Sequence, residues 1–497
     1  MRPSVVTLAL ALVLASGSLD AQPSGASGPL ASGVAALVAS DYAKAEADLA
    51  QVKGAGEADA KIALARAALE QGKYDEAERH AQAAASSAAH KVEATALRAE
   101  ALAERGRRAE AVRLLEGVKG AKGAAARKAR LLLGEYLIAA GKRDAAEEPL
   151  KKIIEEYNDD TITSRDAEGL AQVGRAAFLL RSPKDANQAF NESERVDKKR
   201  VETLLWRAEL FLDKYDPGHA EEVLRDALKI APKRADVLVL MARVKLDQTL
   251  DFEEAEKLVK EALSVHPKHA GAFAVRAGLA LRDMDIERAD KAIADGLAID
   301  GENLELLSLK AAARFLDDDP AGFEAAKKKV FAQNPQFSQF YGIVGEFAEW
   351  EHRYDDIVAM MKEATKVDPD DGKAWAQLGL TQMRAGDEDQ GLAAIQKAWS
   401  KDKFNVRVFN TLNLYEQSIP NEYDMLTDGV FKLRFAKDER PVMERYVPRL
   451  LGEAWASMKA RYGFVPTSPV QVEMYGSRQQ FSVRTSGLPN IGIQGVC

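Results

Sequence analysis

Residues that end helices recur every 34 positions in the second half of this 497-residue chain. Counting back from Pro369 in steps of 34 reaches Pro335, Gly301 and Pro267. Proline lacks an amide hydrogen and restricts the residue before it, so it stops a helix. A constant interval of this length indicates stacked helical hairpins rather than a chain folded around one closed core.

Two adjacent copies show the pattern most completely. Its repeat positions are Tyr341, Gly345, Ala364 and Pro369 in the first copy, and Trp375, Gly379, Ala398 and Lys403 in the second. We expect the aromatic residues to fill the core, and the glycines and alanines to let paired helices approach closely. Overpacking at such small positions costs roughly 1–3 kcal/mol. Because no single hairpin buries its own apolar face, the hairpins must stack.

This pattern resembles the tetratricopeptide repeat family, whose period is 34 residues. It predicts an all-α superhelical solenoid with a small, incomplete α/β element at the C-terminal end. We expect about eleven hairpins over residues 34–404. Stacked hairpins curve into a superhelix whose concave face is lined by the first helix of each unit. The resemblance implies that this face binds a protein or peptide partner.

Composition narrows the function further. Charged residues make up 29% of the chain and aromatic residues 7%, which is typical of a helical array. The net charge of −8 is dispersed and provides no basic stripe of the kind that binds nucleic acid. We therefore expect no nucleic-acid partner, and no transmembrane helix in the mature chain.

The N-terminal segment predicts export. Residues 1–21 read as a signal peptide, with Arg2 before an apolar run from Val5 to Ala15 and a cleavage site after Ala21. That run is too short to span a bilayer. Residues 22–33 are predicted to form a flexible leader, and the single cysteine, Cys497, excludes an internal disulfide. We expect a bacterial protein located in the periplasm or outside the cell.

The character of the sequence changes after Phe404. Residues 405–428 are predicted to form a connecting helix and linker, and residues 429–497 a partial α/β domain. Its expected elements are a strand near 430–435, a helix from Asp438 to Arg461 capped by Asp438, a strand at 470–475, a helix at 478–485, and an extended segment at 488–496. We expect Leu450, Trp455 and Phe481 to be only partly covered.

This order resembles the opening part of a thermolysin-like metallopeptidase domain (gluzincin, peptidase MA-like). The residues that carry the resemblance are Arg440-Pro441, Glu444-Arg445-Tyr446, Trp455, Arg461–Phe464, Val472–Tyr475, Phe481–Thr485 and Gly487-Leu488-Pro489. In that family an HExxH helix binds zinc and activates water. None of the six histidines here begins that motif. We therefore predict no catalytic, cofactor-binding or metal-binding residue, and zinc only with a downstream catalytic segment.

Three other motifs have simpler explanations. His266-Pro267-Lys268-His269 could form a two-histidine metal clip, but Pro267 is a hairpin breaker and no third ligand is near in sequence. Asp317–Pro320 lacks the glycine and the distal glutamate of a calcium loop. The segment at 117–123 lacks the ending of a phosphate loop and reads as a linker.

Two functional hypotheses remain. The first is an exported, non-enzymatic scaffold that binds a partner through its concave face. The second is the N-terminal portion of a zinc metallopeptidase whose repeats present a substrate or partner.

Overall fold

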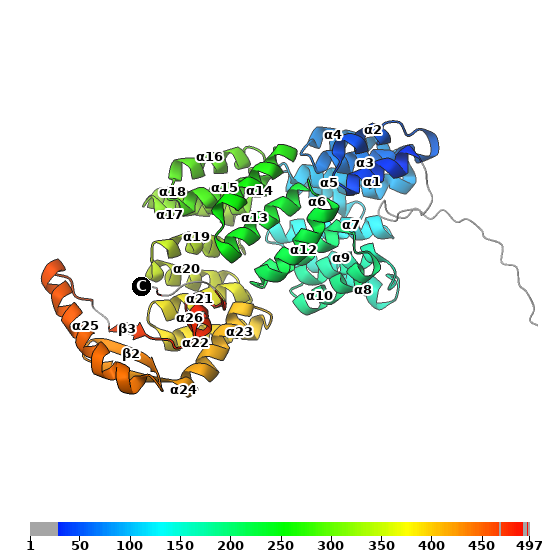
Figure 1. The fold of residues 1–497 in the computed structure, drawn as a ribbon. Coiled ribbons are helices and arrows are strands. Elements are labelled where there is room, and N and C mark those ends of the chain that lie inside the picture. The colour runs from blue at the N-terminus through cyan, green and yellow to red at the C-terminus, as the bar shows by residue number, and fades with distance from the viewer. Residues whose placement is uncertain (1–27, 467–468, 491–494, 496–497) are drawn as a thin grey trace, which may run out of the picture.

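A computed structural model describes residues 28–466, 469–490 and 495. The predicted signal peptide lies outside these residues. Helices follow one another in a curved, continuous stack, and a small sheet lies at the C-terminal end (Figure 1). The predicted all-α superhelical solenoid with a small α/β element is confirmed.

Within the described part of the chain, α1 to α22 form eleven successive pairs, each made of two neighbouring helices. The pairs are α1 (Pro29–Val38) with α2 (Tyr42–Leu49), α3 (Glu57–Leu69) with α4 (Tyr74–Ala84), α5 (Lys91–Ala103) with α6 (Arg108–Glu116), α7 (Ala124–Ala139) with α8 (Arg143–Asn158), α9 (Ala167–Leu179) with α10 (Pro183–Val196), α11 (Val201–Asp213) with α12 (Pro217–Ile230), α13 (Ala235–Thr249) with α14 (Phe252–Val265), α15 (Ala270–Arg282) with α16 (Ile286–Leu297), α17 (Leu304–Leu316) with α18 (Pro320–Gln333), α19 (Gln339–Trp350) with α20 (Tyr354–Val367), and α21 (Gly372–Arg384) with α22 (Glu388–Lys401).

Each pair is joined by a tight turn that contains one residue with a positive φ angle. These residues are Ser40, Gly72, Gly106, Gly141, Arg181, Tyr215, Leu250, Met284, Asp318, His352 and Gly386. A left-handed residue after a helix satisfies its last carbonyl groups and reverses the chain. Aspartates such as Asp251 and Asp285 then cap the second helix, because their side chains accept a hydrogen bond from a first-turn amide.

Close packing within each hairpin depends on small residues. In α21, a Cβ atom at Gly379 would lie 2.7 Å from both the Gly391 carbonyl oxygen and Ile395 Cγ1. In α9, a Cβ atom at Gly174 would lie 2.5 Å from the Phe190 ring. The glycines therefore set how closely the two helices of a hairpin approach, as the repeat pattern predicts.

The predicted leader at 22–33 requires correction. Helix α1 begins at Pro29, and Leu30, Val34 and Leu37 pack against the core of the first hairpin. Proline is well suited to the first turn of a helix because its missing amide hydrogen would have no partner there. Because the residues around Pro29 are mostly small, this part of the sequence reads as a flexible segment rather than a helix.

After α22 the chain continues through α23 (Val406–Asn413), a π-helical turn (Leu414–Ser418) and α24 (Ile419–Glu422) into the C-terminal element. This element contains β1 (Tyr423–Asp428), β2 (Phe431–Ala436), α25 (Arg440–Tyr462), β3 (Val470–Glu473) and α26 (Arg478–Ser486). The strand order is β1-β2-β3. Strand β1 runs antiparallel to β2, with Tyr423 opposite Ala436, and β3 runs parallel to β2, with Val470 opposite Phe431.

Three predictions for this region are wrong in detail. The predicted linker at 405–428 ends in strand β1, whose sequence YDMLTD carries two aspartates and does not alternate cleanly. The partial domain therefore begins with β1, before residue 429. Glu439, rather than Asp438, lies at the N-terminal boundary of α25, and no side chain caps that helix. The predicted extended segment at 488–496 lies largely outside the described residues.

Helix α25 projects away from the stacked hairpins (Figure 1). Trp455 packs edge-on against Phe431 at 5.7 Å between ring centroids, and Trp455 and Phe481 are half-buried. Leu450 is 54% exposed. The expectation that these three side chains are only partly covered is therefore confirmed. No helix among the described residues combines the length and the apolar character that a membrane span requires.

Candidate binding channel

The first helices of seven consecutive hairpins, α9 to α21, surround a cavity of about 610 Å³ on the inner side of the solenoid. Its apolar lining comes from Phe178, Leu205, Leu212, Val239, Leu240, Leu246, Ala274, Val275, Leu309, Ile343 and Phe347. Its charged lining comes from Glu209, Asp213, Asp236, Arg243, Asp247, His269, Arg282, Glu305, Glu346 and Lys373. We call this cavity the channel. Its volume lies within the range of ligand-binding cavities in proteins.

Ion pairs in the channel wall join first helices from hairpins that are not adjacent in sequence. Lys373 Nζ lies 2.5 Å from Asp213 Oδ1, and Arg243 Nη1 lies 2.8 Å from Glu305 Oε1. Burial raises the pKa of Asp213, but Lys373 and Lys214 outweigh it and hold that pKa at about 2. The wall is thus a set of charged groups fixed in place by their partners.

Each of two inner clusters centres on an arginine that several carboxylates share. Arg234 lies within 2.9 Å of Glu70, 3.1 Å of Asp236 and 3.5 Å of Glu202. Burial is the main cause that raises the pKa of Glu70 to about 7, and the neighbouring carboxylates add to it. In the second cluster, Arg175 is shared by Glu135 and Glu209.

The channel is closed along one side by contacts between successive turns of the superhelix, which we call the seam. At six places along the described part of the chain, hydrogen bonds or ion pairs join residues 187 to 196 positions apart. They are Ser40 with Lys233, Tyr74 with Lys268, Arg108 with Asp300, Ile138 with Asn334, Arg181 with Asp368, and Lys214 with Asp402. In each case the turn region of one of the first six hairpins contacts the loop that follows a hairpin further along.

The seam is polar and close. Arg108 Nη2 lies 2.5 Å from Asp300 Oδ2, and the Asp300 side chain is only 3% exposed. Lys214 Nζ lies 2.6 Å from Asp402 Oδ2. The Asp213–Lys373 pair of the channel wall also joins the sixth hairpin to the eleventh. The cavity therefore has no open lateral groove at this position through which a folded partner domain could enter.

Glycines at three successive turns permit this approach. A Cβ atom would lie 2.8 Å from His266 Cε1 at Gly72, 2.9 Å from Asp300 Oδ1 at Gly106, and 2.7 Å from Asn334 Oδ1 at Gly141. Their positive φ angles favour glycine as well. The sequence pattern marks these residues as hairpin turns but does not reveal their contacts with the next superhelical turn.

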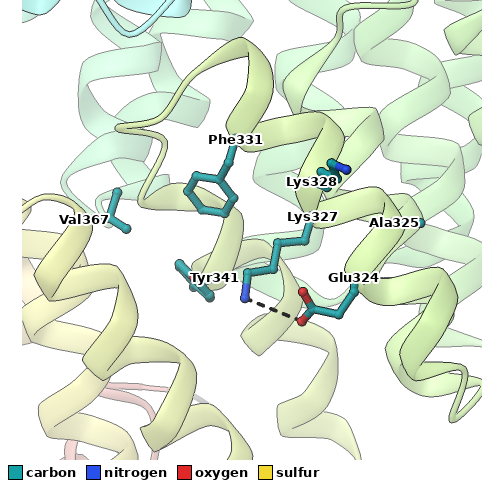
Figure 2. Close-up of a pocket in the computed structure, with 7 residues that line it drawn as sticks. All are labelled: Glu324, Ala325, Lys327, Lys328, Phe331, Tyr341 and Val367. Carbon is teal, nitrogen blue, oxygen red and sulfur yellow. Dashed lines mark ion pairs between the residues drawn. The ribbon is translucent and has the colours of Figure 1, made fainter.

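A second hollow, of about 590 Å³, lies on the outer side between α18 and α20. Phe331 and Tyr341 point into it, and Lys327 pairs with Glu324 at its edge at 3.6 Å (Figure 2). The Phe331 and Tyr341 ring centroids are 5.7 Å apart. This hollow is therefore a gap between the second helices of two adjacent hairpins, and side chains of the hydrophobic core form its base.

The C-terminal element is held to the last hairpin by a buried ionic cluster. The Arg434 side chain is 4% exposed and lies 2.6 Å from both Glu388 Oε2 and Glu473 Oε2. Arg484 Nη2 lies 2.6 Å from Glu473 Oε1, and Arg384 donates to the Thr485 carbonyl oxygen at 2.6 Å. Glu388 belongs to the first turn of α22, so the sheet is anchored directly to the repeats.

The predicted repeat positions occupy the hairpin cores and not the channel. The buried ones are Tyr341 and Gly345 in α19, Ala364 in α20, Gly379 in α21 and Ala398 in α22. Pro369 lies in the loop before α21, and its carbonyl oxygen accepts a hydrogen bond from the indole of half-buried Trp375.

The residues considered as metal ligands also have structural roles. His269 Nε2 lies 3.0 Å from Asp236 Oδ1, and buried His266 packs against Tyr74 across the seam. Asp319 caps α18. No group of three metal-ligating side chains occurs among the described residues. Sequence reasoning missed the channel residues, because Glu209, Asp236 and Asp247 look like ordinary solvated helix charges.

Fold and channel together define an α-solenoid of tetratricopeptide-type hairpins. Residues 62–124 match a family model described as a tetratricopeptide repeat. No curated protein matches the sequence.

Several solved structures are similar in fold. Yeast Tom70 is 12% identical, with an alignment that covers 78% of this chain and 94% of Tom70 at a TM-score of 0.38. A chain of the Cut9-Hcn1 assembly of the APC/C is 13% identical, and the alignment covers 78% of this chain and 90% of that chain at a TM-score of 0.35. A tetratricopeptide repeat protein from Thermus thermophilus is 17% identical, and the alignment covers 37% of this chain and 98% of that chain at a TM-score of 0.34.

Proposed function

We propose that this protein is an exported, non-enzymatic scaffold that binds a segment of a partner protein inside the channel. The observation that carries this proposal is the convergence of seven first helices on one cavity with a mixed apolar and charged lining. Side chains from separate hairpins converge there, and rigid helices hold them in place. Such a surface gives a bound chain both apolar contacts and directed polar partners.

Site-specific photo-cross-linking in the native host tests the binding site. A photoreactive residue at Leu309, inside the channel, should give a discrete cross-linked partner, whereas one at exposed Trp350 should not. Gly278→Leu should abolish the Leu309 product, because Gly278 lines the channel and leucine would fill it. Gly452→Leu is the matched control, since nothing lies within 4 Å of a Cβ atom there. An equal yield from Gly278→Leu and Gly452→Leu would exclude the channel.

Export is tested by fractionating cells that express the full chain. The mature protein should be recovered from the periplasm or the medium, and its N-terminal sequence should begin at Gln22. An unprocessed Met1 terminus on all of the protein would contradict the proposal.

The C-terminal element favours a second candidate, a portion of a zinc metallopeptidase. Strands β2 and β3 are parallel and joined through α25, and the outward side of that helix is uncovered, with Tyr446 56% and Met458 62% exposed. For the chain of 497 residues we expect no stoichiometric zinc by elemental analysis and no hydrolysis of casein. Tightly bound zinc together with proteolysis would favour the peptidase over the scaffold.

A further inference from the structure

The channel lining has a surplus of carboxylates. Six carboxylate side chains line it, against three side chains of arginine or lysine. Each of those three cations already has a carboxylate partner in the lining: Arg243 pairs with Glu305, Arg282 with Glu346, and Lys373 with Asp213. The three remaining carboxylates, Glu209, Asp236 and Asp247, therefore decide what charge the channel accepts.

None of these three has a cation to itself. Glu209 shares Arg175 with Glu135, and Asp236 shares Arg234 with Glu70 and Glu202. Burial opposes ionisation of Asp236, but its hydrogen bond with His269 and the charge of Arg234 outweigh burial and hold its pKa well below the ordinary value. Glu209 and Asp247 are therefore the lining carboxylates that the wall neutralises least.

Asp247 makes no hydrogen bond or ion pair among the described residues. Arg243 on its own helix, Arg282 on α15, Lys373 on α21 and Arg407 on α23 contribute favourable charge from a distance. Even so, desolvation by the surrounding channel wall raises the pKa of its carboxyl. Asp247 itself is exposed, so a cation that enters the channel can reach it. The three lining cations are paired elsewhere, and Arg407 stacks over the Tyr215 ring at 4.4 Å.

Burial also raises the pKa of Glu209, with Glu135 and Asp236 adding to the effect against the attraction of Arg175. A positive charge brought into the channel would stabilise the ionised form of both Glu209 and Asp247. A negative charge would face carboxylates that the protein does not fully neutralise.

We propose that the channel binds an unfolded, basic segment of a partner protein, whose cationic side chains meet Glu209, Asp236 and Asp247 while its apolar side chains pack on the leucine and valine wall. This rests on the proposed function, that the channel binds a protein segment. The segment is taken to be unfolded because the Asp213–Lys373 pair closes the side of the channel. A folded domain would have to enter through the side that this pair closes, whereas an extended chain would not.

Fluorescence anisotropy on the full chain tests the proposal with three labelled peptides of equal length, in which leucine alternates with lysine, serine or glutamate. We expect the lysine peptide to bind at least about tenfold more tightly than the glutamate peptide. The Glu209→Gln/Asp247→Asn double variant should bind the lysine peptide about tenfold more weakly than the wild type does. Its preference for the lysine peptide over the serine peptide should therefore be smaller. Neither substitution leaves a lone buried cation, because Arg175 keeps Glu135 and Asp247 has no partner.

Glu363→Gln is the matched control. Glu363 is exposed on α20, and Lys366 is its ion-pair partner among the described residues. The Glu363→Gln variant should bind all three peptides with unchanged affinity, and circular dichroism should show that every variant keeps its helices. Equal loss in Glu363→Gln, or unchanged binding in the double variant, would overturn the proposal.

The remaining outcomes separate this inference from the proposed function. If the serine peptide binds as tightly as the lysine peptide and Gly278→Leu abolishes both, the channel binds segments without regard to charge, and only this inference fails. If the lysine peptide binds equally well to Gly278→Leu, its site lies outside the channel and both fail. Displacement of the lysine peptide by an equal concentration of spermine would assign the site to small polycations, which overturns the protein segment as occupant.

Discussion

Gly106 serves two structural purposes at one position. Its φ of 71° places it in the left-handed region, where a side chain costs free energy, and it lies against Asp300 of the next superhelical turn. Gly386 occupies the equivalent turn of the eleventh hairpin with a φ of 90° and open space around it. Comparing the same substitution at Gly106 and at Gly386 therefore separates the free-energy cost of backbone strain from that of the seam contact.

We expect Gly106→Ala to lower the thermal unfolding midpoint more than Gly386→Ala does. Both variants incur the left-handed penalty of about 1 kcal/mol, and only Gly106→Ala also forces a Cβ atom to within 2.9 Å of Asp300 Oδ1, which adds roughly 1–3 kcal/mol. Melting followed by circular dichroism measures the difference. Equal shifts in the two variants would mean that the seam contributes nothing at this turn.

Glu70 gives the protein a pH dependence of definite sign. Its pKa in the folded protein is about 7 against an ordinary value of 4.5, so the folded state holds a proton that the unfolded state releases. The stability from this group is present at low pH and is lost as the pH rises through about 7. We expect the unfolding midpoint to fall between about pH 5 and pH 8, and Glu70→Gln to reduce that fall. A fall of equal size in Glu70→Gln would contradict the assignment, and Glu363→Gln serves as the control.

Arg434 couples two elements that are distinct in fold. It lies on β2, yet its guanidinium bonds Glu388 of α22 as well as Glu473 of β3. Removing one partner of a buried ion pair costs about 3–5 kcal/mol, because the other charge stays buried. The docking of the sheet on the last hairpin therefore combines this ionic cluster with apolar contact, in which Val483 and Tyr475 pack with the core of the last hairpin.

We therefore expect Arg434→Met to expose the chain from about Tyr423 onward to rapid limited proteolysis while the hairpins stay resistant. Arg440→Met is the matched control, since Arg440 on α25 pairs with Asp424 at the protein surface, where an ion pair contributes little to stability. Peptide mapping of the digest identifies the first cut. Equal resistance of the two variants would show that the ionic cluster does not hold the sheet.

Local periodicity explains which elements were predictable. The hairpins repeat the same contacts every 34 residues or so, and therefore Gly379 and Ala398 reveal their packing in the sequence. Strand β1 is not predictable this way, since its two aspartates belong to an edge strand with one exposed side. The surplus charge at Asp247 is equally hidden, because its neighbours come from three other helices.

At the scale of the whole molecule, the seam arises from the small rotation between successive hairpins, which accumulates until one turn meets the next. The contact between Ser40 and Lys233 and that between Lys214 and Asp402 have nearly the same sequence separation, 193 and 188 residues. The rotation is thus uniform over these hairpins. No single hairpin sequence encodes it, and so the channel and its closure could be seen only in three dimensions.

The seam is held mainly by polar pairs, whereas the hairpins are held by apolar cores, so the seam should open before any helix melts. We expect Arg108→Glu/Arg181→Glu to increase the radius of gyration measured by small-angle X-ray scattering without loss of helical circular dichroism. Like charges would then face Asp300 and Asp368, both with little exposed side-chain area. Arg288→Glu/Arg449→Glu is the control, because those arginines form only exposed ion pairs within their own segments.

Restoring the attraction provides the decisive comparison. Adding Asp300→Arg and Asp368→Arg to the double variant should return the radius of gyration to that of the wild type, since the seam pairs re-form with reversed polarity. The lysine peptide should associate faster with the opened variant and regain the wild-type rate in the restored one, because the side of the channel is closed again. An unchanged radius in the double variant would mean that apolar stacking alone fixes the pitch, and the polar contacts would then be a consequence of the superhelix rather than its fastening.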